Sequence, residues 1–137
     1  MKKYFLIVSL LFFLCPYTHG KISVLSGQAK DYAGKQLFLM KYTDEIIFSE
    51  EIVDSVMVDS AGYFQFQIKV ENTAYYFIPL PVYQAFLFVE PGVNYQIELP
   101  PYIALSFSQS FNPYFSKEKL LLNIIDKDEK DLNHQIF

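Results

Sequence analysis

The feature that most constrains the fold of this chain is a strict alternation of apolar and polar side chains over residues 64–70. The apolar positions are Phe64, Phe66, Ile68 and Val70, and the polar positions between them are Gln65, Gln67 and Lys69. Successive side chains of a β-strand point to opposite faces, so the pattern is typical of a strand with one buried and one wet face. The segment therefore predicts a strand that covers one side of a core.

Turn signals divide residues 22–99 into short segments. Residues 59–62 (DSAG) predict a hairpin turn, and Pro91 with Gly92 predicts another. The expected strands are residues 22–28, 37–42, 46–48, 55–58, 64–70, 74–80, 85–89 and 93–99. About seven or eight short strands at this spacing indicate an antiparallel β-sandwich or small barrel. We therefore expect an all-β fold, an antiparallel β-sandwich domain over residues 21–100, followed by an irregular tail and a short C-terminal helix.

Three of the expected strands contain runs that are apolar on both faces. These runs are residues 37–40 (LFLM), 75–78 (YYFI) and 86–89 (FLFV). A two-layer sandwich needs only one apolar face per strand, so something must cover the second face. The tail over residues 102–125 is one candidate, and a missing domain or a partner chain is the other. An uncovered face would form the kind of apolar patch that marks an interaction site.

Aromatic residues gather within residues 75–88. Tyr75, Tyr76 and Tyr83 are the candidate interaction surface, because aromatic platforms can stack on sugars or peptides. Binding of a glycan or another small ligand is therefore an alternative function. Ordinary core packing and the preference of strands for aromatic residues explain the same cluster, and this is the interpretation that we favour.

The composition argues against several classes of protein. The chain has 11 basic and 15 acidic residues, a net charge of −4, and every basic residue is lysine. Nucleic-acid binding proteins present a basic face and read bases mainly with arginine, so we do not expect that class. One cysteine and two histidines leave little material for a metal site or a nucleophile–base pair. We expect no catalytic residue, no metal, no cofactor and no enzyme activity.

A group of acidic residues calls for a separate interpretation. Glu50, Glu51, Asp54 and Asp59 lie close together in sequence, but they lack the alternate spacing of oxygen ligands in a calcium loop. Charged residues at a sheet edge also prevent edge-to-edge aggregation. A solvated strand edge is therefore the better interpretation of the group.

The first twenty residues have the layout of a secretory signal peptide. Lys2 and Lys3 precede an apolar run over residues 4–15, and Thr18 and Gly20 are small residues at the −3 and −1 positions of a cleavage site. The apolar run is shorter than the roughly 20 residues of a membrane-spanning helix. We expect export to the periplasm or cell envelope, with no transmembrane span after removal of residues 1–20.

Residues 101–137 form a C-terminal extension of a different character. Asp126 is a candidate cap for a helix that begins near Lys127, with an apolar stripe of Leu132, Ile136 and Phe137. The chain then stops in the middle of a turn on an apolar residue. A frayed helix end and a truncated polypeptide both fit, and we expect truncation.

Several stretches resemble a known family. Residues 34–37 (GKQL) and 59–66 (DSAGYFQF) resemble prealbumin-type sandwiches. Residues 89–102 (VEPGVNYQIELPPY), 112–115 (NPYF) and 131–133 (DLN) extend the likeness. Together they resemble the N-terminal β-sandwich of exported envelope proteins whose C-terminal half is a thioredoxin-like module.

The resemblance implies a supporting role and no chemistry. In that family the redox work belongs to a Cys-x-x-Cys motif of the later module, and this chain has no such motif. No functional residue can therefore be carried over. We expect a non-catalytic exported module that binds another protein, or positions a missing C-terminal domain, through its doubly apolar strands.

Overall fold

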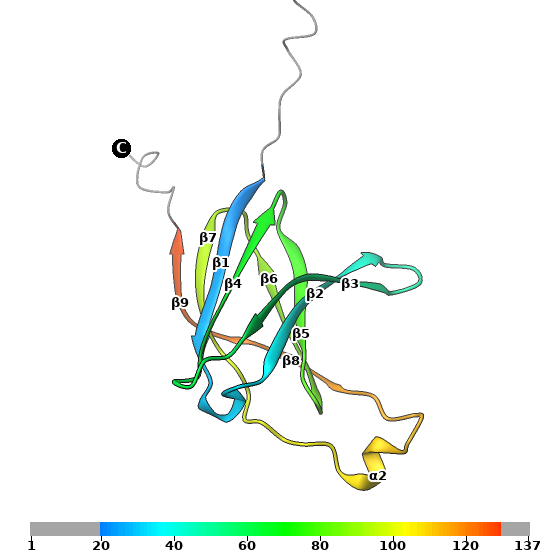
Figure 1. The fold of residues 1–137 in the computed structure, drawn as a ribbon. Helices are drawn as coiled ribbons and strands as arrows, with labels where there is room; N and C mark the ends of the chain where they lie inside the picture. The colour runs from blue at the N-terminus through cyan, green and yellow to red at the C-terminus, as the bar shows by residue number, and fades with distance from the viewer. Residues whose placement is uncertain (1–19, 130–137) are drawn as a thin grey trace, which may run out of the picture.

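The computed structural model describes residues 20–129 and confirms an all-β chain (Figure 1). The strands are β1 (Lys21–Gln28), β2 (Gln36–Asp44), β3 (Ser49–Met57), β4 (Tyr63–Val70), β5 (Ala74–Pro79), β6 (Tyr83–Val89), β7 (Val93–Glu98), β8 (Glu118–Leu121) and β9 (Asn123–Glu129). A short 3-10 helix, η2 (Lys30–Tyr32), precedes β2, and one turn of α-helix, α2 (Phe107–Ser110), precedes β8. The described part of the chain thus contains nine strands, slightly more than expected.

The strands form two sheets. The four-stranded sheet has the order β4-β1-β7-β9, and the five-stranded sheet has the order β3-β2-β5-β6-β8. Most neighbouring strands are antiparallel, as expected, but β1 pairs with β7 and β6 pairs with β8 in parallel. Both sheets are therefore mixed. In each parallel pair the later strand, β7 or β8, runs beside the earlier strand in the same direction.

Alternate side chains of the two sheets meet in one core. The alternation over residues 64–70 is confirmed on β4, where Phe64, Phe66, Ile68 and Val70 are buried and the residues between them face outward. Leu25 from β1, Leu39 from β2 and Leu87 from β6 complete the centre of the core, and all three are fully buried. The period of two in the sequence thus fixes which side of each strand faces inward.

The β2–β3 hairpin departs from the expected strands. Residues 46–48 form its turn, and β3 begins at Ser49. The prediction of a strand over residues 46–48 was wrong, because the Asp44 carboxylate accepts hydrogen bonds from the backbone N–H groups of Ile46 (2.7 Å) and Ile47 (3.2 Å) and folds the chain back. The hairpin extends beyond the sandwich in Figure 1.

The C-terminal extension adds a strand to each sheet. β8 extends the five-stranded sheet and β9 extends the four-stranded sheet, so the sheets continue past the expected domain end at residue 100. The expected helix start near Lys127 was wrong, because this residue lies within β9 and pairs with Tyr95 of β7. Pairing with an exposed sheet edge overrides a local capping signal. The rest of the expected helix, with Leu132, Ile136 and Phe137, lies outside the described residues.

A polar network joins the end of β6 to three strands of the four-stranded sheet. The Ser23 hydroxyl donates to the Glu90 carbonyl oxygen (2.7 Å), and the Tyr95 hydroxyl donates to the Glu90 carboxylate (3.2 Å). Lys127 forms an ion pair with the same carboxylate, and this contact holds the pKa of Glu90 below its ordinary value. The network fastens β9 against β7 at the sheet edge.

The expected signal peptide over residues 1–20 lies outside the described residues, except for Gly20 at its end. In residues 20–129 no helix has the length and apolar character needed to cross a bilayer. The segment that follows β7 contains α2 and projects from the sandwich on the same side as the β2–β3 hairpin in Figure 1. It matches the irregular tail expected from the sequence.

The close packing of β1 on β7 predicts a sensitive position at Gly27. A Cβ atom at Gly27 would press on the backbone oxygen of Ile97 and lie 2.8 Å from Cζ of Phe64. We expect Gly27→Ala to lower the free energy of unfolding by about 1–3 kcal/mol through overpacking. Gln28→Ala on the exposed end of the same strand should change it by less than about 0.5 kcal/mol. Urea denaturation checks both, and equal midpoints would contradict the expectation.

Candidate functional site: an aromatic face of the five-stranded sheet

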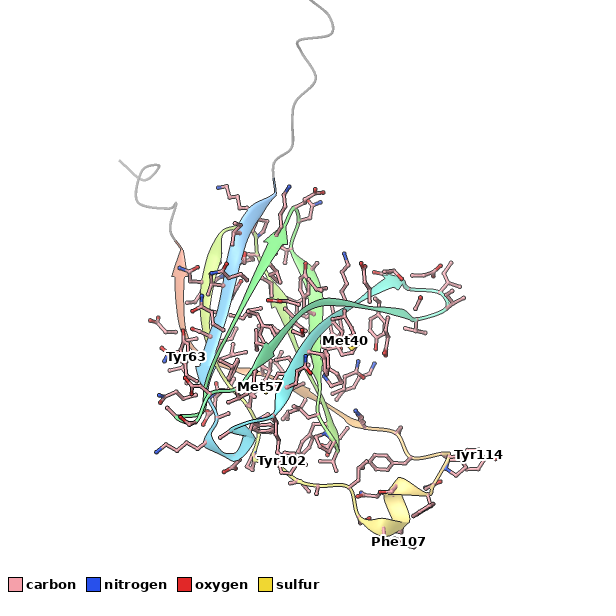
Figure 2. All side chains as sticks on the ribbon, viewed as in Figure 1. Met40, Met57, Tyr63, Tyr102, Phe107 and Tyr114 are labelled. Carbon is pink, nitrogen blue, oxygen red and sulfur yellow. The ribbon has the colours of Figure 1, made fainter. Side chains whose placement is uncertain are left out.

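The three runs that are apolar on both faces come together in the structure. They lie on β2, β5 and β6, which are direct neighbours in the five-stranded sheet. Their second apolar sides therefore form one continuous surface, which we call the outer face: the side of the five-stranded sheet that points away from the core. Met40 on β2 and Met57 on β3, labelled in Figure 2, belong to it.

One row of apolar side chains crosses the outer face from edge to edge. The register pairs Met40 with Ile52 on one side and with Phe77 on the other, Phe77 with Phe86, and Phe86 with Leu121. Side chains at paired positions share a face, so all five strands contribute one apolar residue to this row. The outer face is thus apolar across the whole width of the sheet.

Phe77 is the centre of a second hydrophobic cluster, separate from the core between the sheets. Its side chain points outward, yet only 1% of it is exposed. The rings of Tyr42 and Tyr75 lie against it, with ring centroids 4.9 Å and 6.1 Å away. Tyr42 and Tyr75 also stack on each other at 5.8 Å. Contacts of this kind contribute beyond their buried area and fix the ring positions.

The cluster continues to both sides of the two tyrosines. Phe86 stacks on Tyr75 at 5.2 Å and Phe88 meets it edge-on at 5.7 Å. At the base of the projecting hairpin, Phe48 meets Tyr42 edge-on at 5.6 Å. Phe48 and Phe88 remain 63% and 57% exposed. The face therefore offers two large aromatic groups to solvent on a fixed aromatic base.

Between these two exposed rings the face is hollowed. The hollow has a volume of about 590 Å³, and Tyr42, Phe48, Tyr75 and Phe88 line its apolar part. Lys41, Glu45 and Thr73 supply the polar side chains of its rim. The volume lies within the range of small-molecule sites, and aromatic walls with a few polar groups are typical of them.

Burial raises the pKa of two tyrosines. Desolvation raises the pKa of Tyr75, with a smaller contribution from Tyr42 beside it, and desolvation alone raises the pKa of Tyr76. Both hydroxyls therefore lose their protons at a higher pH than an exposed tyrosine does. The Tyr42 hydroxyl accepts a hydrogen bond from the Gln84 side-chain amide (2.7 Å), which holds the ring in place. The tyrosine hydroxyls of this face can bind and orient a ligand.

The structure does not bring the three candidate tyrosines together. Tyr75 faces outward and lines the hollow. Tyr76, the next residue on β5, points into the core and is only 4% exposed, because neighbouring strand residues face opposite sides. Tyr83 lies on the inner side of β6 and packs on the core. Only one of the three thus contributes to the outer face.

Two residues of the cluster, Tyr42 and Phe48, were not among the site residues predicted from the sequence. Tyr42 follows Phe38 and Met40 at a spacing of two, and this period could have placed it on the outer face. Phe48 carries no such signal. It reaches Tyr42 only because the hairpin turn reverses the chain between them.

The residues that follow β7 leave the outer face open. They extend the five-stranded sheet at its edge through β8. Several of their large side chains are exposed, among them Phe107, Phe111 and Tyr114, with Tyr114 at 91%. Phe107 and Tyr114 are labelled in Figure 2. Residues 102–125, one of the two candidates for covering the doubly apolar strands, therefore leave that face uncovered.

Two residues of the acidic group, Asp54 and Asp59, have structural partners. The Asp54 carboxylate accepts hydrogen bonds from the backbone N–H groups of Ser55 (2.8 Å) and of Gln67 on β4 (3.1 Å), so it bridges the two sheets at their edge. Asp59 accepts from Ala61 and Tyr63 and closes the β3–β4 turn. Residues 20–129 contain no cluster of histidine, cysteine, aspartate and glutamate that could hold a metal ion.

Comparison of the chain with protein-family models, curated proteins and solved structures gives no match.

The buried position of Phe77 generates a prediction about stability. Phe77→Ala would leave a void under Tyr42 and Tyr75, and we expect it to lower the free energy of unfolding by about 3–5 kcal/mol. Phe88→Ala removes the same atoms from a largely exposed site and should cost less than about 1 kcal/mol. Chemical denaturation compares the two, and a smaller loss for Phe77 would show that the outer cluster does not stabilise the sheet.

Proposed function

We propose that the chain is a non-catalytic, exported β-sandwich module that binds another protein, or positions a further domain, through its outer face. The observation that carries the proposal is the apolar row that crosses all five strands of one sheet. Phe77 at the centre of the row is buried, but Ile52, Phe88 and Leu121 are exposed on the same face. Several large apolar side chains exposed on one face of a folded domain are characteristic of protein interaction sites.

The opposite side of the molecule supports this interpretation. On the outer side of the four-stranded sheet, β4 presents Gln65, Gln67 and Lys69, and β7 presents Gln96 and Glu98. The outer side of the four-stranded sheet is thus mostly polar, with Ile22 and Tyr63 among its exposed apolar residues, whereas an apolar row crosses the outer face of the other sheet. Both sheets belong to one domain, so the apolar outer face is not a general property of the surface of this protein.

Export is the second part of the proposal, and its support comes from the sequence. The layout of residues 1–20 fits a secretory signal peptide, which would deliver the chain to the periplasm or cell envelope. The resemblance to envelope proteins with a thioredoxin-like module points to the same place. In such a protein the sandwich would dock or position the catalytic partner without reacting itself.

The outer face supports binding more than chemistry. The aromatic rings and the Tyr42 hydroxyl are engaged with one another and with Gln84. The polar side chains at the hollow, Lys41, Glu45 and Thr73, lie on its rim. This arrangement suits recognition of a partner surface, with an apolar centre and a polar border.

Dye binding and site-specific cross-linking test the docking role. We expect Ile52→Lys and Phe88→Lys to lower the fluorescence of a bound apolar dye by roughly half or more, because each puts a charge into the apolar surface. Gln96→Lys, on the polar side of the molecule, is the matched control and should leave the dye signal unchanged.

A photo-reactive phenylalanine analogue in place of Phe88 should form protein adducts in cells that express the chain. The same analogue in place of Gln96 should form none. Absence of adducts from Phe88, or equal adducts from both positions, would overturn a docking role for the outer face.

The hollow favours a second candidate function, the binding of a glycan or another small ring-shaped ligand. Tyr75 provides part of its aromatic lining, and Lys41 and Glu45 could pair with ligand hydroxyl groups at the rim. Of the three tyrosines expected to bind such a ligand, only Tyr75 lines the hollow.

Thermal-shift screening with cell-envelope oligosaccharides tests the second candidate. A ligand that binds the folded chain at 100 times its Kd adds about 2.7 kcal/mol to stability and raises the melting temperature by several degrees. Thr73→Lys should abolish the shift by filling the rim, whereas Lys69→Ala on the other sheet should not. No shift at millimolar ligand concentrations would exclude this function.

A further inference from the structure

Two charged residues of the outer face, Glu50 and Lys119, lie at opposite corners, and two more, Lys41 and Glu45, border the hollow. Glu50 lies on β3 and pairs with Tyr42 of β2. Both belong to the row that contains Tyr75 and Phe88. Lys119 lies on β8 and pairs with Gln84 of β6. Their row lies on the other side of the central apolar row. β3 and β8 are the two edge strands of the sheet, so an acid and a base stand at the ends of one diagonal.

Neither corner charge has an ion-pair partner among the described residues. Both side chains are exposed, and in residues 20–129 no ion pair involves Glu50 or Lys119. Between them the paired rows of the sheet carry aromatic, aliphatic and uncharged polar side chains, and the rim of the hollow adds Lys41 and Glu45, which have opposite charges. The surface therefore has an apolar centre with one negative and one positive corner.

This arrangement is complementary to itself. A two-fold axis in the plane of the face places a second copy face to face with the first. When this axis is perpendicular to the diagonal between the corners, each corner of one copy meets the opposite corner of the other. Glu50 of each copy then lies opposite Lys119 of the other, and the central apolar rows cross over one another. An interface of this kind, in which the same patch serves both subunits, is the usual form of a homodimer.

We propose that the partner of the outer face is a second copy of this chain, and that two sheets pack face to face across such an axis. The proposal rests on the proposed docking function and names its partner. The strands of the two copies would cross at a large angle, within the range known for packed sheets.

Charge explains why a second copy would choose this surface. The chain is acidic, with a net charge of −4, so most pairs of surfaces on two copies would repel. The outer face carries acids and bases in equal number, Glu45 and Glu50 with Lys41 and Lys119, and is neutral overall. Two copies can therefore approach through it without like-charge contact, and the two Glu50–Lys119 pairs fix their relative orientation.

Analytical ultracentrifugation of the chain purified from expressing cells tests the proposal, with charge reversals as the sharpest variants. We expect a dimer, and we expect Glu50→Lys or Lys119→Glu alone to raise its Kd by roughly tenfold or more, because two-fold symmetry makes each substitution count twice. The double variant should restore the Kd to near its original value, since it exchanges the two corners.

Matched controls come from exposed charges elsewhere. Glu71→Lys and Lys69→Glu make the same charge changes away from the outer face and should leave the Kd nearly unchanged. Failure of the double variant to restore the dimer, or equal effects of the controls, would overturn the proposed orientation.

A strictly monomeric chain at concentrations near 1 mM would overturn the second copy as partner. Dye binding that Phe88→Lys abolishes would in that case still support the docking function with a different protein. The loss of both dimer and dye binding would instead remove the docking function itself, so the two failures can be told apart.

Discussion

The structure depends on the burial of alternate side chains between two sheets. Phe66 on β4, Leu39 on β2 and Leu87 on β6 are wholly removed from water in one core. Burying a side chain of this size contributes about 1.5–3 kcal/mol, and a slip of one residue in any strand would reverse its faces. The core therefore sets the register of every strand, and with it the set of residues that must point outward.

The two sheets meet this constraint in different ways. On the four-stranded sheet the residues left outside are mostly amides and charges, which water solvates. On the five-stranded sheet they include Met40, Phe77 and Phe86, which solvent does not stabilise. The chain partly compensates by packing aromatic rings on one another, so that Phe77 is buried without any covering layer. What remains exposed is the ring surface at the border of this cluster, and this is the part that a partner could bury.

Local patterns in the sequence predicted the all-β class and most of the strands, because a period of two and a glycine-containing turn act over a few residues. They also identified the doubly apolar runs. They could not show that these runs are neighbours, since this follows from the order of strands in the sheet. For the same reason the separation of Tyr75 from Tyr76 was missed, although it follows from the alternation on β5 once the strand is placed. The strand formed by residues 123–129 depends on the free edge of β7, which no local signal encodes.

The β2–β3 hairpin shows how much the outer face depends on exact chain geometry. Phe48 has a φ of 51°, which is rare for a bulky aromatic residue and costs about 1–3 kcal/mol. The Asp44 cap on the turn and the edge-on contact between Phe48 and Tyr42 offset this cost and hold the ring above the sheet. Phe48 thus forms a wall of the hollow that comes from the hairpin turn and not from a strand. Contacts within the chain position this wall without a ligand or partner. A rigid wall of this kind loses little entropy on binding, and this makes the same surface suitable for a small ring or for the side chains of a protein partner.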